Sequence, residues 1–398
     1  MSERPLWTVL SEVDQRAGEL ALTLPLLSVS KLHGVVRYKD LFPDRVIRAD
    51  DLSHYKVVET GQIVLNKMSA ATGAVGRAEE QGLVSPDYAV LSPSDDCDSR
   101  YLKYLLGSEE FCKNRVEPRL QGIGIGDVSN ARTPRVTTMS YLSIVAFLPE
   151  VQMQTKIVDY LDRETGEIDA MLATLDVLTE ALHSRRASVV ERETVARPGR
   201  LTRLKFCADV SLGKTFQGVR KSDCETLLNY VRAASIQPNG LELDDQRMWM
   251  TQEEQRKYDL RKGDILIVEG GAGFGRSVHL TQDMPGWGFQ NHVIRVRPDQ
   301  YHDGRFLNYC VKGHYSGGLI ALLADGATIP GLSSDKAKNL PIPDMSLEEQ
   351  QRIADHLDEV TGRIDAMLAT IDELKALLVE RRSALITDVV TGRKKIPS

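Results

Sequence analysis

The sequence predicts an α+β protein with a pseudo-two-fold repeat, in which two globular modules of mixed helices and strands alternate with two long helices that pack together. Three observations predict this fold. A 37-residue segment recurs 196 positions later with 19 identities. Apolar side chains recur at every seventh position in both copies, and short apolar runs separated by glycine turns precede each copy. A chain of 398 residues is long enough to hold several cores of this kind.

The repeated segment covers residues 154–190 and 350–386. Within it the run IDAMLAT at 168–174 recurs unchanged at 364–370, and the pair Arg185-Arg186 recurs as Arg381-Arg382. Self-similarity at a fixed offset indicates that one structural unit is used twice.

Both copies carry a heptad pattern that is typical of a coiled coil. A core of 37 residues makes a helix about 55 Å long, so two packed helices form a stiff spacer. Antiparallel packing would carry the two modules to opposite ends, and parallel packing would place them side by side. The seven-residue steps fall at Leu161, Ile168, Leu175, Leu182 and Val189, and at Leu357, Ile364, Ile371, Leu378 and Leu385. The second half of the seam is predicted at Met171, Leu172, Leu178, Val360, Met367, Leu368 and Leu374.

Start and stop signals bound both helices. Pro149 opens the first helix, and Ser346 to Glu349 form a capping box before the second. The ends are marked by Pro198-Gly199 and by Gly392. Gly166 and Gly362 sit at matched places inside the helices, which predicts either a close approach between helices or a local bend.

The two modules, residues 1–148 and 199–341, resemble each other faintly. Residues 56–64 echo 259–266, and each segment is followed by a glycine-rich turn that ends in Gly-Arg. A strand-like run and a short helical stretch follow in both, which predicts an α+β module. Near-identical helices beside diverged modules suit one assembly surface used twice and two different recognition surfaces.

Charge and cysteine content leave nucleic acid open as a partner. The net charge is −6, but residues 150–197 hold 6 Lys and Arg against 10 Asp and Glu, and residues 342–398 hold 8 against 11. The rest of the chain is therefore close to neutral, and phosphate binding depends on local basic surface. Five scattered cysteines without a C-x-x-C pair predict neither zinc nor disulfides and suit a reducing cytoplasm. The sequence shows no signal peptide and no transmembrane run.

Enzyme motifs are weak. Residues 208–215 fit a relaxed phosphate-loop pattern ending in Lys214-Thr215, but a poor strand precedes them and a poor helix start follows. Glu373-Leu374-Lys375 is the Asp/Glu-x-Lys match and lies mid-helix, and Ser85-Pro86-Asp87-Tyr88 fits the amino-methyltransferase motif only in part. Catalysis and a bound cofactor are not expected.

Two unlike modules alternate with two helices that are each preceded by a Pro-to-Gln segment (Pro149 to Gln154, Pro343 to Gln350) and continue with I-x-x-x-L-D, an I-D run and Arg-Arg. Across its full length this chain resembles the specificity subunit of type I restriction-modification enzymes. The resemblance implies that residues 1–148 and 199–341 are target-recognition domains, each reading half of an asymmetric bipartite DNA site. It implies that segments 149–198 and 342–398 form an antiparallel spacer that docks two modification (methyltransferase) subunits. Restriction (helicase-nuclease) subunits would join through the complex and, with the modification subunits, hold the catalysis.

Candidate DNA contacts rest on side-chain chemistry near the expected turns. Arginine and lysine reach phosphates or guanine, and amides read adenine. An ordinary surface role is open for each candidate. Arg77 and Arg276 are the first choices, and the other candidates are Lys67, Arg119, Gln121, Gln290 and Asn291. Two other functions stay open: a scaffold that joins two ligand-binding modules without DNA, and a nucleotide-binding enzyme that uses residues 208–215.

Overall fold

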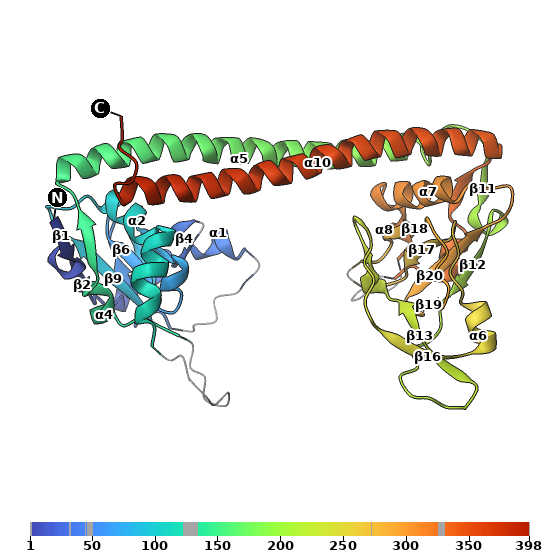
Figure 1. Cartoon of the computed structure of the whole chain (residues 1–398), viewed down its shortest axis with the longest axis horizontal. Helices are drawn as coiled ribbons and strands as arrows, with labels where there is room; N and C mark the ends of the chain where they lie inside the picture. The colour runs from blue at the N-terminus through green and yellow to red at the C-terminus, as the bar shows by residue number, and fades with distance from the viewer. Residues whose placement is uncertain are drawn as a thin grey trace. The chain divides into compact units, whose positions relative to one another are not determined.

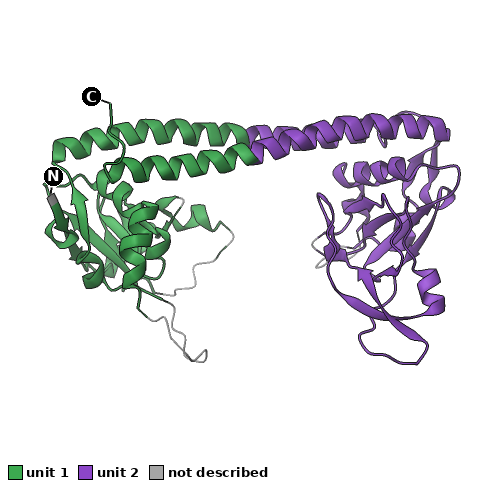
Figure 2. Cartoon of the chain, viewed as in Figure 1, with its two compact units in different colours: residues 1–175, 373–398 green, residues 176–372 purple. Residues whose placement is uncertain are grey.

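A computed structural model of the chain describes residues 2–31, 33–43, 45, 51–121, 134–271, 273–324 and 331–397. It divides into two compact units (Figure 2): unit 1 comprises residues 1–175 and 373–398, and unit 2 comprises residues 176–372. Each unit contains one globular module and part of both long helices (Figure 1). The mixed α and β content and the two long helices are as predicted.

Unit 1 is built on an antiparallel four-stranded sheet in the order β2-β9-β6-β7. Its strands are β2 (Leu10–Val13), β9 (Tyr88–Pro93), β6 (Ile63–Asn66) and β7 (Val75–Arg77). Two-stranded sheets pair β1 (Ser2–Pro5) with β10 (Val145–Leu148), β3 (Leu27–Ser30) with β4 (Gly34–Arg37), and β5 (Lys56–Val58) with β8 (Gly82–Val84). The helices of the module are α1 (Tyr38–Leu41), α2 (Ser99–Gly107), α3 (Glu109–Phe111) and α4 (Thr138–Leu142).

Strand β6, in the middle of this sheet, is buried on both faces. Successive side chains of a strand point to opposite faces, so its apolar run serves two cores. Ile63 and Leu65 join the cluster that includes α2, whereas Val64 packs with Val58 and Val84 on the other face. The same cluster as Ile63 also takes in the end of the chain's last helix, at Leu385, Ile386, Val389 and Val390.

Unit 2 repeats this sheet in the order β12-β20-β17-β18. The strands are β12 (Ala208–Leu212), β20 (Val293–Pro298), β17 (Ile265–Val268) and β18 (Ser277–His279). A three-stranded sheet, β16 (Arg247–Thr251), β13 (Glu225–Val231) and β19 (Trp287–Phe289), is added to it. The pairs β11 (Leu201–Arg203) with β21 (Pro341–Pro343) and β14 (Ile236–Gln237) with β15 (Gly240–Leu241) complete the strands, and the helices are α6 (Gln252–Lys257), α7 (Gly304–Ser316), α8 (Leu319–Leu323) and α9 (Ser334–Lys338).

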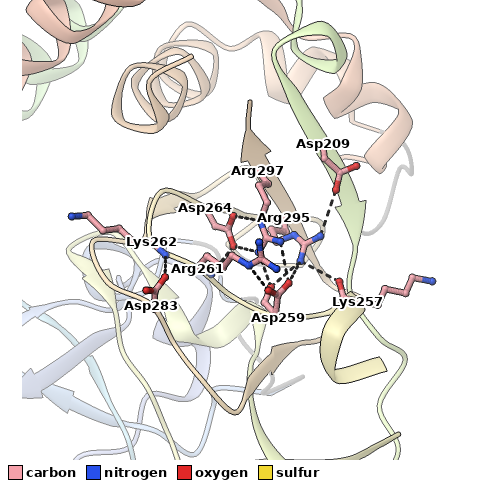
Figure 3. A network of polar contacts seen from close by, with 9 residues as sticks. All are labelled: Asp209, Lys257, Asp259, Arg261, Lys262, Asp264, Asp283, Arg295 and Arg297. Atoms are coloured by element: carbon pink, nitrogen blue, oxygen red, sulfur yellow. Dashed lines mark hydrogen bonds and ion pairs between the residues drawn. The ribbon is translucent and has the colours of Figure 1, made fainter. Parts of the chain in front are cut away.

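A buried polar network joins β20 to the segment before β17 (Figure 3). Arg297 donates to both oxygens of the Asp264 carboxylate at 2.7 Å, and Asp264 is 1 % exposed. Arg295, 5 % exposed, donates to the carbonyl of Asp259 at 2.8 Å and lies over the Phe289 ring of β19. Because a buried guanidinium needs partners, this network holds one end of the main sheet against the added sheet.

The long helices are α5 (Val151–Glu193) and α10 (Leu347–Val390). Their first seam line is inside: Leu161, Ile168 and Leu182 of α5 and Leu357, Ile364, Ile371 and Leu378 of α10 are at most 9 % exposed, and Leu175 is half-buried. The second line agrees with the expectation at Leu172 and Leu368 and otherwise differs from it. It lies four residues after the first, at Thr165 and Thr361, which are buried, and at Leu172 and Leu368, which are half-buried.

Most apolar residues three positions after the first line face outward, but Val360 is half-buried and packs against the core cluster of unit 2. Met171, Leu178, Met367 and Leu374 are 43–53 % exposed. Neighbouring residues of a helix point about 100° apart around its axis. The residues three and four positions after the first line therefore cannot both face the centre of the same interface. Gly166 and Gly362 have nothing beyond their own helix within 4 Å of an added Cβ, which removes close helix approach as their explanation.

Candidate functional site

One end of each four-stranded sheet gathers the loops that hold most of the candidate residues. Because the strands of unit 2 are mutually antiparallel, one end of its sheet gathers the end of β12, the start of β20, the end of β17 and the start of β18. This end of the sheet, where the loops lie, is called its edge below. The matching edge of unit 1 is formed by the end of β6 and the starts of β7 and β9. Loops at a sheet edge are free to vary while the strands keep the fold.

Three of the four candidates in unit 1 lie close together in the fold. Lys67 directly follows β6, and its carbonyl accepts a hydrogen bond from Val136 at 3.0 Å. The neighbouring Arg135 pairs with Gln121 through backbone bonds of 2.8 and 3.0 Å, and Arg119 lies two residues earlier. The segment 122–133 lies outside the described residues. The two sets of backbone bonds bring Lys67, Arg119 and Gln121 close together.

Arg77 lies apart from this group. It pairs with Ile63 at the start of β6, which is the opposite end of the sheet. Its guanidinium donates to the Ser99 hydroxyl at 2.8 Å and forms an ion pair with Glu79. A contact with DNA would require Arg77 to give up these bonds.

The Gly-Arg echo between the modules is out of register by three residues. Strand pairing matches Leu65–Val75 with Ile267–Ser277, so the structural counterpart of Arg77 is His279 and that of Arg276 is Ala74. The turns themselves are alike: Gly73 and Gly275 occupy matched positions with φ of 87° and 81°, a conformation that favours glycine. The arginine simply falls inside the strand in one module and before it in the other.

The three candidates in unit 2 share one sheet edge. Arg276 precedes β18, and its carbonyl accepts from Val268 at the end of β17. Val268 pairs with Val293, the first residue of β20, and Gln290 and Asn291 lie just before that strand. All three side chains are half-buried, so they are held by the fold and still reach solvent.

Lys214 has a structural role at the same edge. No helix follows it among the described residues 213–224, and its ammonium pairs with Glu254 and bonds Gln217 at 3.2 Å. A phosphate loop needs a helix directly after its lysine. The nucleotide-binding reading of residues 208–215 therefore fails on geometry.

Each module is fastened to a long helix by the same set of polar contacts. In unit 1 the Tyr104 hydroxyl donates to Asp162 at 2.6 Å and meets Thr165 at 3.3 Å. In unit 2 Tyr309 donates to Asp358 at 2.7 Å and meets Thr361 at 3.1 Å. Burial, together with the adjacent carboxylate, raises the pKa of Tyr104 to about 12, so the phenol remains a donor.

A glutamine at the start of each helix adds a second matched contact. The Gln154 side chain accepts from the backbone of Asp98 at 2.8 Å and donates to the carbonyl of Pro149. Gln350 accepts from the backbone of Asp303 at 3.0 Å and donates to Met345. Both glutamines are at most 1 % exposed, so they fix where each module meets its helix. These contacts were missed from the sequence, although their residues are identical between the two copies.

Within each unit the two helices run in opposite directions (Figure 1). In unit 1 Arg382 of α10 donates to Asp169 of α5 at 2.9 Å. In unit 2 Arg186 of α5 donates to Asp365 of α10 at 3.0 Å. The second residue of each Arg-Arg pair thus bonds the aspartate of the I-D run in the other helix.

Comparisons with known proteins agree with this architecture. A family model for the type I restriction modification DNA specificity domain matches residues 221–376. The StySPI specificity subunit of Salmonella potsdam is 28% identical over 182 residues, which is 42% of this chain and 38% of that protein. The EcoBI specificity subunit of Escherichia coli is 30% identical over 100 residues, 25% of this chain and 20% of that protein. The chain thus matches less than half of the length of these relatives.

Solved structures share the fold at low identity. A chain from a study of complex assembly and conformational transition of the type I R-M system has a TM-score of 0.71 at 15% identity, covering 98% of this chain and 97% of that one. The HsdS subunit of Thermoanaerobacter tengcongensis has a TM-score of 0.53 at 15% identity, covering 98% and 96%. Residues 221–376 thus match the specificity-domain model, the chain is similar in part of its sequence to type I restriction enzyme specificity subunits, and it shares the fold of these solved structures.

Proposed function

We propose that this chain selects the DNA sequence for a type I restriction-modification complex. Residues 1–148 and 199–341 are its two target-recognition domains, and each reads one half of an asymmetric bipartite site. Segments 149–198 and 342–398 form an antiparallel coiled coil that holds the domains at a set spacing along one duplex.

The proposal rests on one observation: the same contacts join each module to its long helix, whereas the loop-bearing ends of the two sheets carry different residues. The tyrosine–aspartate–threonine and glutamine contacts are the same in both units. The sheet edges they support differ: Lys67 follows β6, whereas Glu269 follows β17 at the matched position. A rigid frame with two different edges suits recognition of two different half-sites.

The chemistry at these edges suits base and phosphate contacts. Arg276 can bind a guanine edge or a phosphate, and Gln290 and Asn291 can each pair with adenine through two hydrogen bonds. Lys67, Arg119 and Gln121 form the corresponding group in the first domain. Arg77 is the weakest of the seven candidates for a DNA contact, because its guanidinium already bonds Ser99 and Glu79.

Exposed apolar residues on the long helices of each unit support docking of two modification subunits: Met171 and Leu374 in unit 1, and Leu178 and Met367 in unit 2. Apolar side chains that recur along an exposed helix surface favour a protein partner. Restriction subunits join through that complex, which holds the methylation and cleavage chemistry. No described helix is long and apolar enough to cross a membrane. As part of the proposal, we assign the complex to the reducing cytoplasm because duplex DNA is present there.

The test exchanges residues 199–341 for the corresponding domain of a relative and maps methylated sites in cells that carry the modification subunits. One half-site should change while the other half-site and the gap stay the same. A control exchange of residues 1–148 should change the opposite half. If either exchange alters both halves together, or if the complex shows no gel shift with duplex DNA, the two-reader proposal fails.

A further inference from the structure

A pocket of unit 2 gathers positive charge where the second module meets helix α5. Its volume is about 270 Å³. It is lined on the helix side by His183 and Arg186, and on the module side by Arg276, Ser277 and Lys312. All of these residues belong to unit 2.

Two of its cations have no bonded partner. The side chains of Arg276 and Lys312 form no hydrogen bond or ion pair with any residue that the structure describes, although the Lys312 ammonium lies 5.8 Å from the centre of the Tyr309 ring. Arg186 is paired with Asp365. An ammonium or guanidinium that is half-buried without a bonded anion loses hydration that no hydrogen bond or ion pair replaces.

Two further features show that this site is short of an acceptor. The Ser277 hydroxyl is buried and has no hydrogen-bond partner among the described residues. Burial, and then the charge of Arg186, lowers the pKa of Lys312, because the pocket disfavours a second positive charge. The carboxylates of Asp358 and Asp365 act in the opposite direction without reversing it.

The corresponding surface of unit 1 is different. Lys312 lies three residues after Tyr309, and the residue three after Tyr104 is Gly107. The pocket on that side is lined by Glu109 and Glu110 as well as by lysines. The surplus of cations is therefore a property of the second module and not of the repeated frame.

We propose that the pocket of His183, Arg186, Arg276, Ser277 and Lys312 binds a phosphate group. Phosphate offers several acceptor oxygens and a negative charge, which match two unpaired cations and an unbonded hydroxyl. Bound there, it joins helix α5 to the module and removes the repulsion between their cations. The same chemistry is presented by a free phosphate or phosphorylated metabolite and by the backbone of duplex DNA.

The test measures thermal unfolding of the full chain, with its modification subunits if they are needed for solubility, against inorganic phosphate at constant pH and ionic strength. A ligand that binds the folded state raises Tm with a saturating dependence. The rise should occur in the wild type and in Lys262→Gln, an exposed lysine of the same unit that provides an equal change in charge. It should be lost in Lys312→Gln and in Arg276→Gln. The second variant covers the case in which the first fails to fold. No saturating rise in the wild type, or an equal rise in all variants, overturns the proposal.

A second measurement identifies the source. If the phosphate belongs to DNA, inorganic phosphate competes with the duplex, and Lys312→Gln reduces the slope of log affinity against log salt by about 0.9, the value for one lost phosphate contact. If the phosphate is free in solution, this slope is unchanged while the Tm response is lost. If the chain binds phosphate but no duplex DNA, the phosphate-site proposal stands and the proposed function fails. The two failures are therefore distinguishable.

Discussion

The length of the two long helices should set the gap between the two half-sites. The perturbation adds one heptad to α5 after Leu175 and one to α10 after Asp372, where the two units divide. Whole heptads keep the seven-residue line of buried side chains in phase. Every contact that fastens a module to its helix lies outside the inserted residues.

The size of the effect follows from helix geometry. Seven residues at about 1.5 Å each add about 10.5 Å to the helix pair. Successive base pairs lie about 3.4 Å apart, so the gap should lengthen by about three base pairs. That step also rotates the second half-site by about 100° around the duplex, since one turn takes about 10.5 base pairs. Three heptads add about 31 Å, or about nine base pairs, and nearly restore the rotational phase. We therefore expect weak modification with one heptad and stronger modification with three.

Genome-wide methylation mapping reads out half-sites and gap together. The matched control puts the heptad into α5 alone, which shifts Arg186 away from Asp365 and should lower the stability of the chain. An unchanged gap in a stable double insertion would refute the reasoning. A change in either half-site sequence would refute it equally, because the inserted residues lie far from both sheet edges in the sequence.

Three further predictions concern stability. Gly166→Ala and Gly362→Ala should each stabilise the chain by about 1 kcal/mol and raise Tm by about 2–4 °C, since open space surrounds both positions; a lower Tm would contradict this. Tyr309→Phe should cost about 1–3 kcal/mol in urea unfolding because it removes the phenol's hydrogen bond to the Asp358 carboxylate, which keeps its contact with Arg305; an unchanged stability would contradict this. Stability should fall as pH decreases through 6.5, because burial lowers the pKa of His279 and His314 in the folded chain and the unfolded chain takes up protons first; His314→Gln should flatten the dependence, and an unaltered slope would contradict this.

The repeat made the helical part of the fold readable from the sequence. Seven-residue spacing depends on local geometry alone, and it identified Ile168 and Ile364 as interior residues, which are 5 % and 4 % exposed. Capping is local too: Ser346 accepts from the backbone of Glu349 at 3.3 Å. The sheets were less readable, because strands such as Ile63–Asn66 are apolar on both faces and lack the alternation that reveals a face.

The candidate site could be predicted only in part, for a related reason. Sequence similarity aligns residues 73–77 with residues 273–276. The register of the strands decides which residues correspond in the structure, and it depends on pairing between distant segments. The partners of Arg77 are a serine and a glutamate that no spacing rule connects to it. In contrast, Asp162 and Thr165 recur as Asp358 and Thr361, and buried-contact roles could have been inferred from that identity.

The end of α10 belongs to unit 1, although it follows unit 2 in the sequence, and this has a consequence for synthesis on the ribosome. The core of the first module includes Leu385, Ile386, Val389 and Val390, which are translated only after all of unit 2. Unit 2 needs nothing beyond residue 372. Because domains tend to fold as they emerge, the first module should keep part of its apolar core open until unit 2 has been translated. A chain that stops before these residues should therefore leave part of the apolar core of the first module exposed.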